Sequence, residues 1–151
     1  MTPLQCAESI ADFLRESFAE YDEMNWETGT TFNVIAGFLP IKQTTNAMRK
    51  DCPAIVVRPL LITDEQKETT CDMVIFAVTY DEDMKRGCYS LYHILEFIRL
   101  KLLTGNPVNR QWHVKPGMET YIPDEQPNPF WEGRVDFTVN LPQPHRAYNY
   151  T

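Results

Sequence analysis

The sequence predicts an α+β fold, with a mostly antiparallel sheet of four to five strands and two main helices packed on one face. The segments 2–21 and 83–103 repeat apolar residues every three or four positions, as amphipathic helices do. The segments 54–62, 70–80 and 134–142 are β-rich runs. The resulting order of helix, strand, strand pair, helix, strand and strand is typical of α+β proteins.

The first predicted helix has a start signal and a continuous apolar stripe. Thr2, Pro3 and Gln5 match a capping box with proline at the first helical position. Ile10 and Phe13 widen the stripe. Its main members are Leu4, Ala7, Ala11, Leu14, Phe18 and Tyr21.

The next fifty residues alternate between loop and strand signals. Residues 22–30 are predicted as a polar loop, and residues 31–40 as a first strand with one apolar side. That side comprises Phe32, Val34, Ala36 and Phe38. Residues 41–53 follow neither period, and they are predicted as a long loop that could contact partners.

The remaining strands differ in their predicted positions. Pro59 cannot donate a ladder hydrogen bond, which predicts an edge position or a bulge for 54–62. The segment 70–80 is apolar on both faces and is predicted to lie centrally, covered on each side by a helix or another protein. In the last strand, Val135, Phe137, Val139 and Leu141 are expected to point inward.

An acidic cluster, Asp81 to Asp83, comes between the central strand and the second helix. Acidic side chains are favoured at helix starts by the exposed N–H groups, so Asp83 is predicted to be the helix cap. The ligand order of a calcium loop is absent. The cluster is therefore interpreted as structural.

The second predicted helix is apolar over more than half of its circumference. The surplus is expected to pack under the first helix or to form a subunit interface. Aromatic residues in this helix and in the last third of the chain are the candidate interface, although the loop aromatics could instead close the ends of the core. The candidates are Tyr92, Phe97, Trp112, Phe130 and Trp131.

Length and composition indicate one domain over 1–142 and a loosely ordered tail over 143–151. The net charge of −7 opposes tight binding to nucleic acid. No apolar run reaches the ~20 residues that span a bilayer, and no signal peptide is evident, which indicates a protein made in the cytoplasm. The four cysteines lack paired spacing and are expected to be reduced and mostly buried.

Motifs for catalysis, metals or cofactors are not found. The three histidines form no metal-binding pair, and the sequence contains neither a nucleophile elbow nor a phosphate-binding glycine loop. We therefore expect a protein that is not an enzyme and has no cofactor. Two alternatives remain: an enzyme whose site is assembled from Asp81, Glu82, His93 and Glu96, and a cytoplasmic small-ligand or peptide binding module.

The order and texture of the elements resemble the tail terminator, or tail completion, proteins of long-tailed bacteriophages. The likeness covers most of residues 4–142. Five stretches carry it: "CPAIVVRPLLI", "CDMVIFAVTYDED", "GCYSLYHILEFIRLKLL", a proline-rich stretch and "FWEGRVDFTVNLP". The long loop 41–52 departs from the compact pattern, so this loop could alter which surface meets which neighbour.

The resemblance implies a virion protein at the head-proximal end of the tail. Such subunits form a hexameric ring that caps the tail tube, stops its polymerisation and joins it to the neck or connector. It implies tail tube and neck proteins as partners, a lumen through which DNA passes, and no catalytic residue. A connector stopper or a tube subunit is the alternative within phage proteins. Acidic residues facing the lumen would let DNA slide.

Overall fold

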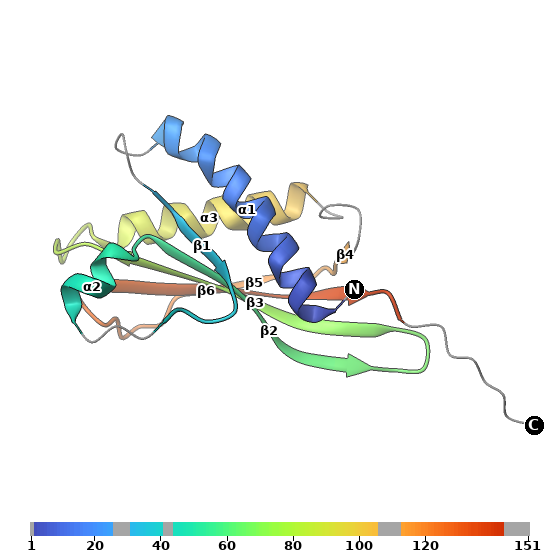
Figure 1. The fold of residues 1–151 in the computed structure, drawn as a ribbon. Coiled ribbons are helices and arrows are strands. Elements are labelled where there is room, and N and C mark those ends of the chain that lie inside the picture. Colours follow the sequence, from blue (N-terminus) through green and yellow to red (C-terminus); the bar gives the residue numbers. More distant parts are fainter. Residues whose placement is uncertain (1, 26–30, 41–43, 106–112, 144–151) are drawn as a thin grey trace, which may run out of the picture.

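The computed structural model describes residues 2–25, 31–40, 44–105 and 113–143, and of residues 21–25 only the main chain. Figure 1 shows helices and a sheet in two layers. The helices are α1 (Pro3–Asn25), α2 (Thr45–Lys50) and α3 (Cys88–Thr104). The strands are β1 (Asn33–Ala36), β2 (Ala54–Asp64), β3 (Thr69–Tyr80), β4 (His113–Val114), β5 (Glu119–Tyr121) and β6 (Phe130–Leu141).

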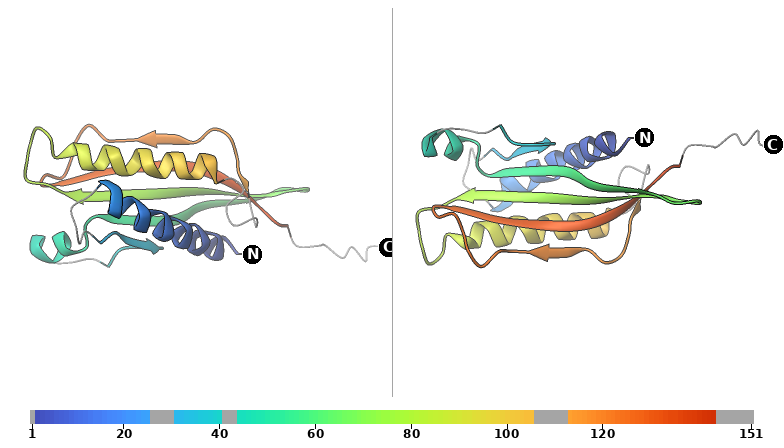
Figure 2. Two further views of the ribbon diagram at one scale, coloured as in Figure 1. Left: turned by 90° about the horizontal axis from the view of Figure 1, so that it is seen from above. Right: turned by 90° about the horizontal axis from the view of Figure 1, so that it is seen from below.

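The six strands form one sheet in the order β1-β2-β3-β6-β4, with β5 also beside β6. β1 runs parallel to β2, and every other pair is antiparallel. The long helices α1 and α3 cover the same face, while the short α2 lies at one end (Figure 2). The predicted α+β fold is therefore confirmed, although the sheet has six strands where four to five were predicted.

The start of α1 is the predicted capping box. The main-chain N–H of Gln5 donates to Oγ1 of Thr2 at 3.1 Å, and the N–H of Thr2 donates to Oε1 of Gln5 at 2.9 Å. Two N–H groups that the helix itself cannot satisfy are thereby bonded. The helix continues to Asn25, so the prediction of a polar loop from residue 22 was wrong for 22–25. Residues 26–30 lie outside the described residues.

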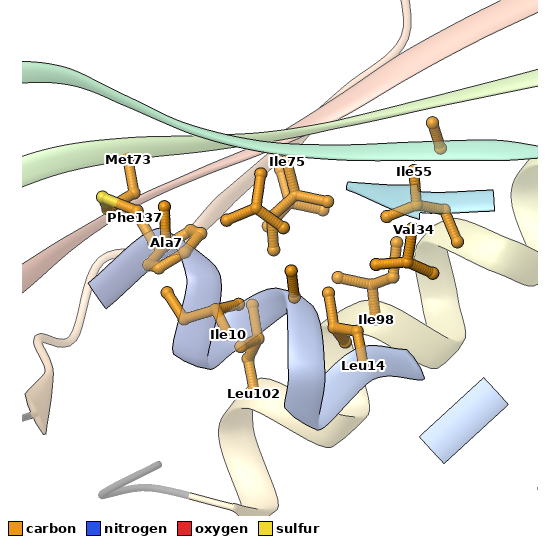
Figure 3. Packing of buried hydrophobic residues seen from close by; sticks show 14 of the residues in the cluster. Ala7, Ile10, Leu14, Val34, Ile55, Met73, Ile75, Ile98, Leu102 and Phe137 are labelled. Carbon is orange, nitrogen blue, oxygen red and sulfur yellow. The ribbon is translucent and has the colours of Figure 1, made fainter. Parts of the chain in front are cut away.

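The core lies between the helical layer and the sheet, as Figure 3 shows. Leu14 and Ile10 of α1, Ile98 of α3, and Ile75 of β3 are fully buried there. All four inward positions predicted for the last strand are buried, at 6% exposure or less. Their neighbours on β6 point to the opposite face, as period-two alternation requires.

Pro59 marks a change in β2. The pairing register between β2 and β3 shifts between Pro59 and Leu61, which confirms the predicted bulge. On its other side, β2 is paired with β1 only from Ala54 to Val57. The second half of β2 is therefore a sheet edge, as the missing N–H of proline favours.

The prediction that β3 lies centrally is confirmed, since β3 pairs with β6 along its whole length and with β2 from Thr69 to Val78. Two predictions were wrong. A helix, α2, occupies part of the expected loop 41–53; Thr44 caps it by accepting from the N–H of Ala47 at 3.1 Å. The first strand ends at Ala36, and Phe38 beyond it is 72% exposed.

Asp83 is not the N-cap of α3. That position belongs to Gly87, which makes no side-chain cap hydrogen bond. The Asp83 carboxylate instead accepts from the N–H groups of Lys85 at 2.9 Å and Arg86 at 3.2 Å. These bonds lower its pKa, because they favour the charged form. Asp83 thus closes the turn just before the helix, and the prediction missed its position by one turn.

Candidate functional site: an uncovered sheet face and an unpaired strand edge

The structure separates the five aromatic residues predicted for an interface. Phe130 and Trp131 are buried within the protomer, at 8% and 9% exposure. The Trp131 Nε1 donates to the carbonyl oxygen of Asp81 at 3.1 Å, and the Phe130 ring meets the edge of Tyr80 with centroids 5.3 Å apart. Trp131 belongs to the core cluster, which was the alternative interpretation of the loop aromatics, whereas Phe130 lies outside that cluster and packs against Tyr80.

Of the other three predicted residues, Tyr92 remains exposed, at 53%. Phe97 is half-buried and packs against Phe18 of α1, with ring centroids 4.7 Å apart. Trp112 lies outside the described residues. Part of the apolar surplus of the second helix is therefore core under α1, and only Tyr92 among the described candidates has a largely free side chain.

The outer side of α3 carries an apolar stripe around an ion pair. Its apolar members recur at helical spacing and are each about half exposed: Tyr89, Tyr92, Leu100 and Leu103. Between them Arg99 Nη2 lies 2.7 Å from Glu96 Oε1. The opposite side of the helix is fully buried, so α3 has two apolar faces and the protomer covers one.

The hairpin of β2 and β3 carries a second exposed apolar group that sequence reasoning missed. Leu60, Leu61 and Ile62 are 59%, 57% and 49% exposed. No strand among the described residues pairs with the outer edge of the segment 59–64. Figure 2 shows this end of the hairpin extending beyond the helical layer. The signal was present in the sequence as three consecutive apolar residues directly after the bulge-forming proline.

The sheet face opposite the long helices is lined by charged and aromatic side chains. The guanidinium carbon of Arg58 lies 4.0 Å from the ring centroid of Phe38 and 4.7 Å from that of Phe76. Its Nε is buried without a hydrogen-bond partner among the described residues. Cation–π attraction from both rings offsets part of that cost. Arg58 is thus held between the rings of Phe38 and Phe76 on the uncovered face.

A shallow hollow of about 350 Å³ lies on this face. Thr138 donates to Asp72 Oδ1 at 2.8 Å, and Arg134 Nε lies 3.1 Å from Asp136 Oδ2. Three acidic residues and one arginine line the hollow, so its charge is net negative. Its charged lining comprises Asp72, Glu119, Arg134 and Asp136.

A second hollow, of about 330 Å³, lies between α2 and the end of the sheet that carries Phe130. Its walls are mostly apolar, with two carboxylates and one thiol among them. The lining residues are Leu39, Pro40, Met48, Asp51, Cys52, Ala54, Val78, Phe130 and Glu132.

The four cysteines are free thiols. Cys6 and Cys71 are fully buried, and Cys52 and Cys88 are half-buried. Burial raises the pKa of Cys6 to about 12 and that of Cys71 to about 11, because a thiolate loses hydration there. Such thiols are poor nucleophiles near neutral pH.

The residues of the alternative enzyme site do not converge on either hollow. Glu82 accepts from the Tyr80 hydroxyl at 2.7 Å, while Glu96 is bound to Arg99. His93 is exposed on α3. Within the described part of the chain, no group of three or more His, Cys, Asp or Glu side chains could hold a metal ion.

No protein-family model matches the sequence, and comparison with curated proteins finds no significant match. Among the described helices, none is long and apolar enough to cross a membrane. The described residues form a two-layer α+β unit with an uncovered sheet face, an unpaired strand edge and a helix with a second apolar stripe.

Proposed function

We propose that this chain is a structural subunit that assembles into a ring, in the manner of the phage tail terminators that its sequence resembles. In this role a hexameric ring caps the tail tube at its head-proximal end, stops polymerisation and joins the tube to the neck or connector. The observation that carries the proposal is the edge of β2, where three consecutive exposed apolar residues follow Pro59.

An unpaired, apolar strand edge favours association with another polypeptide. Its N–H and C=O groups can pair with a further strand, and natural monomers protect such edges with charges, prolines or bulges. Here Pro59 and the bulge occur at the start of the edge, and Asp64 and Glu65 lie at its end. The apolar part between them, Leu60 to Ile62, has no charged residue.

A closed ring of identical subunits needs two different surfaces that fit each other. The β2 edge and the outer stripe of α3 belong to different layers and are built from different residues, so they suit a head-to-tail contact. Leu100 and Leu103 supply aliphatic contact area on α3, and Tyr89 and Tyr92 supply the amphipathic rings that are enriched in interfaces.

Charge supports a lumen that does not bind DNA tightly. Acidic side chains outnumber arginines in the hollow on the uncovered face. A face with this balance repels a phosphate backbone. α1 also has exposed acids, among them Glu8, Asp12 and Glu16, so charge alone does not separate the two faces.

Native mass spectrometry and light scattering on the purified chain test the ring. We expect six-subunit particles that electron microscopy shows as rings. Leu61→Glu introduces a charge at the apolar edge and should convert rings to protomers, with the unfolding free energy of the protomer changed by less than about 0.5 kcal/mol. The matched control is Met84→Glu, because Met84 is 63% exposed and lies in the turn before α3. It should leave the rings intact.

The ring proposal would be overturned if the chain stayed monomeric at millimolar concentration. It would also be overturned if Leu61→Glu and Met84→Glu changed the oligomeric state equally. The tail role has its own test, since a terminator must stop tube growth. The test uses the tube protein encoded by a gene next to the gene of this chain. Rings added while that tube protein polymerises should shorten the tubes. Unchanged tube lengths would contradict the tail role but not the ring.

A further inference from the structure

The hollow between α2 and the sheet differs from the surfaces proposed for ring formation. Leu39, Pro40 and Met48 approach it from the α2 side, and Val78 and Phe130 approach it from the sheet. Its volume of about 330 Å³ lies at the lower end of the range for small-molecule sites in proteins. Apolar walls of this size suit a compact organic body.

Two carboxylates at this hollow have no partner within the described part of the chain. Neither Asp51 nor Glu132 makes an ion pair or a side-chain hydrogen bond there, and none of the lining residues is basic. Arg49 of α2 is not among the lining residues, and its guanidinium carbon lies 4.7 Å from the ring centroid of Tyr80. Asp51 and Glu132 are therefore the only charged residues in the described lining of this hollow.

Both carboxylates are held in place through their main chains. The N–H of Glu132 donates to Gln126 Oε1 at 2.6 Å, and Gln126 Nε2 donates back to the carbonyl oxygen of Glu132 at 3.0 Å. The N–H of Asp51 donates to the carbonyl oxygen of Met48 at 3.1 Å at the end of α2. The two acids thus extend from anchored backbone, Asp51 at the end of α2 and Glu132 on β6.

The charges of both Asp51 and Glu132 affect the thiol of Cys52. Burial raises the pKa of its thiol, and together with the smaller effects of the Asp51 and Glu132 charges it brings this pKa to about 11. Both carboxylates therefore lie close enough to the same sulfur atom to disfavour a thiolate. A positive charge placed there would be attracted by both.

We propose that this hollow binds a small organic cation, an ammonium group carried on a compact apolar body. The ammonium group lies between the carboxylates of Asp51 and Glu132, and the body packs on Val78, Phe130 and Met48. An anion of the same size is repelled, and a neutral analogue gains only the apolar contact. The site does not depend on the proposed ring, because its lining includes neither the β2 edge nor α3.

Three probes that share a phenylethyl body and differ in the charged or neutral head group test the charge preference: 2-phenylethylamine, 2-phenylethanol and 3-phenylpropionate. Each is titrated into the full chain, and binding is measured by calorimetry. We expect the amine to bind at least tenfold more tightly than the alcohol, and the carboxylate to show no binding. Asp51→Asn with Glu132→Gln should remove the tenfold preference. Glu8→Gln is the matched control, since Glu8 is exposed on α1, on the other side of the sheet.

The position of binding is checked at Cys52. Peptide mapping after alkylation with iodoacetamide should show an altered rate at Cys52 when the amine is bound, and an unchanged rate at the half-buried Cys88. Equal affinities of amine and alcohol would overturn the proposal, as would amine binding that survives the double substitution or leaves Cys52 unaffected. The double variant is expected to fold, because both substitutions preserve side-chain size. Circular dichroism checks this.

Discussion

The indole Nε1 of Trp131 donates a hydrogen bond to the main-chain carbonyl oxygen of Asp81, 3.1 Å away. The bond connects the start of β6 to the segment that leads from β3 into α3. Gly87 lies against the same ring: a Cβ at this position would come within 2.7 Å of the Trp131 Nε1. Trp131 is therefore a structural element of the protomer and not a contact for a partner.

Replacing Trp131 by Phe should lower the unfolding free energy by about 1–3 kcal/mol, because the Asp81 carbonyl loses its donor inside a mostly buried site. Urea denaturation measures this change. Tyr89→Phe also removes one polar hydrogen, but from a side chain that is half exposed, and it should shift stability by less than about 0.5 kcal/mol. Equal shifts would contradict a structural role for the indole.

The capping box at the start of α1 should contribute measurably to stability. Thr2→Ala removes the acceptor for the Gln5 N–H and should cost about 1 kcal/mol, observed by thermal unfolding. Thr2→Ser keeps the hydroxyl oxygen and should retain most of the stability. If serine and alanine behave alike, the hydroxyl bond does not stabilise the helix.

Gly133 has a packing role within β6. A Cβ built there would lie 2.6 Å from Leu95 Cδ1 and 3.2 Å from Ile122 Cγ1. Gly133→Val should therefore destabilise the protein by about 1–3 kcal/mol through overpacking against α3, although valine favours strands. Arg134→Val, one residue along on the uncovered face, should change stability by less than about 1 kcal/mol. Denaturation of both variants in parallel compares the two faces.

The buried thiols make stability fall at alkaline pH. Cys6 and Cys71 have pKa values raised from about 9 to about 12 and 11 in the folded protein, so the folded state holds protons that the unfolded state releases. Their contribution is complete below pH 9 and is lost as the pH rises towards these folded values. Denaturation at pH 8 and pH 10.5 should show this loss. It should be smaller in Cys6→Ala with Cys71→Ala, and an identical loss would exclude the thiols as its cause.

Local sequence signals predicted the elements whose residues determine them directly. The capping box of Thr2 and Gln5 needs only four consecutive residues, and the alternation that buries Val135 and Val139 follows from strand geometry. Pro59 predicted its bulge because proline cannot donate to the ladder at any position. None of these local features depends on which helices and strands pack against each other.

The candidate site was predicted less well, for an identifiable reason. An aromatic residue in a proline-rich segment can close a core or face a partner, and the sequence of Phe130 and Trp131 is the same in both cases. The α2 helix was missed because its six residues have no apolar period and none of them is buried. Asp83 satisfied N–H groups as expected, but one turn before the helix.

The sequence by itself determined the α+β class, the central position of β3 and the inward side of β6, because hydrophobic periodicity and proline chemistry are local properties. Only the tertiary structure decided that Trp131 is internal, that the half of β2 after Pro59 is an unpaired edge, and that Asp51 and Glu132 meet beside Cys52. Trp131 and Asp81 are 50 residues apart in the chain, and Asp51 and Glu132 are 81 apart, so their relative positions follow from the packing of the whole core.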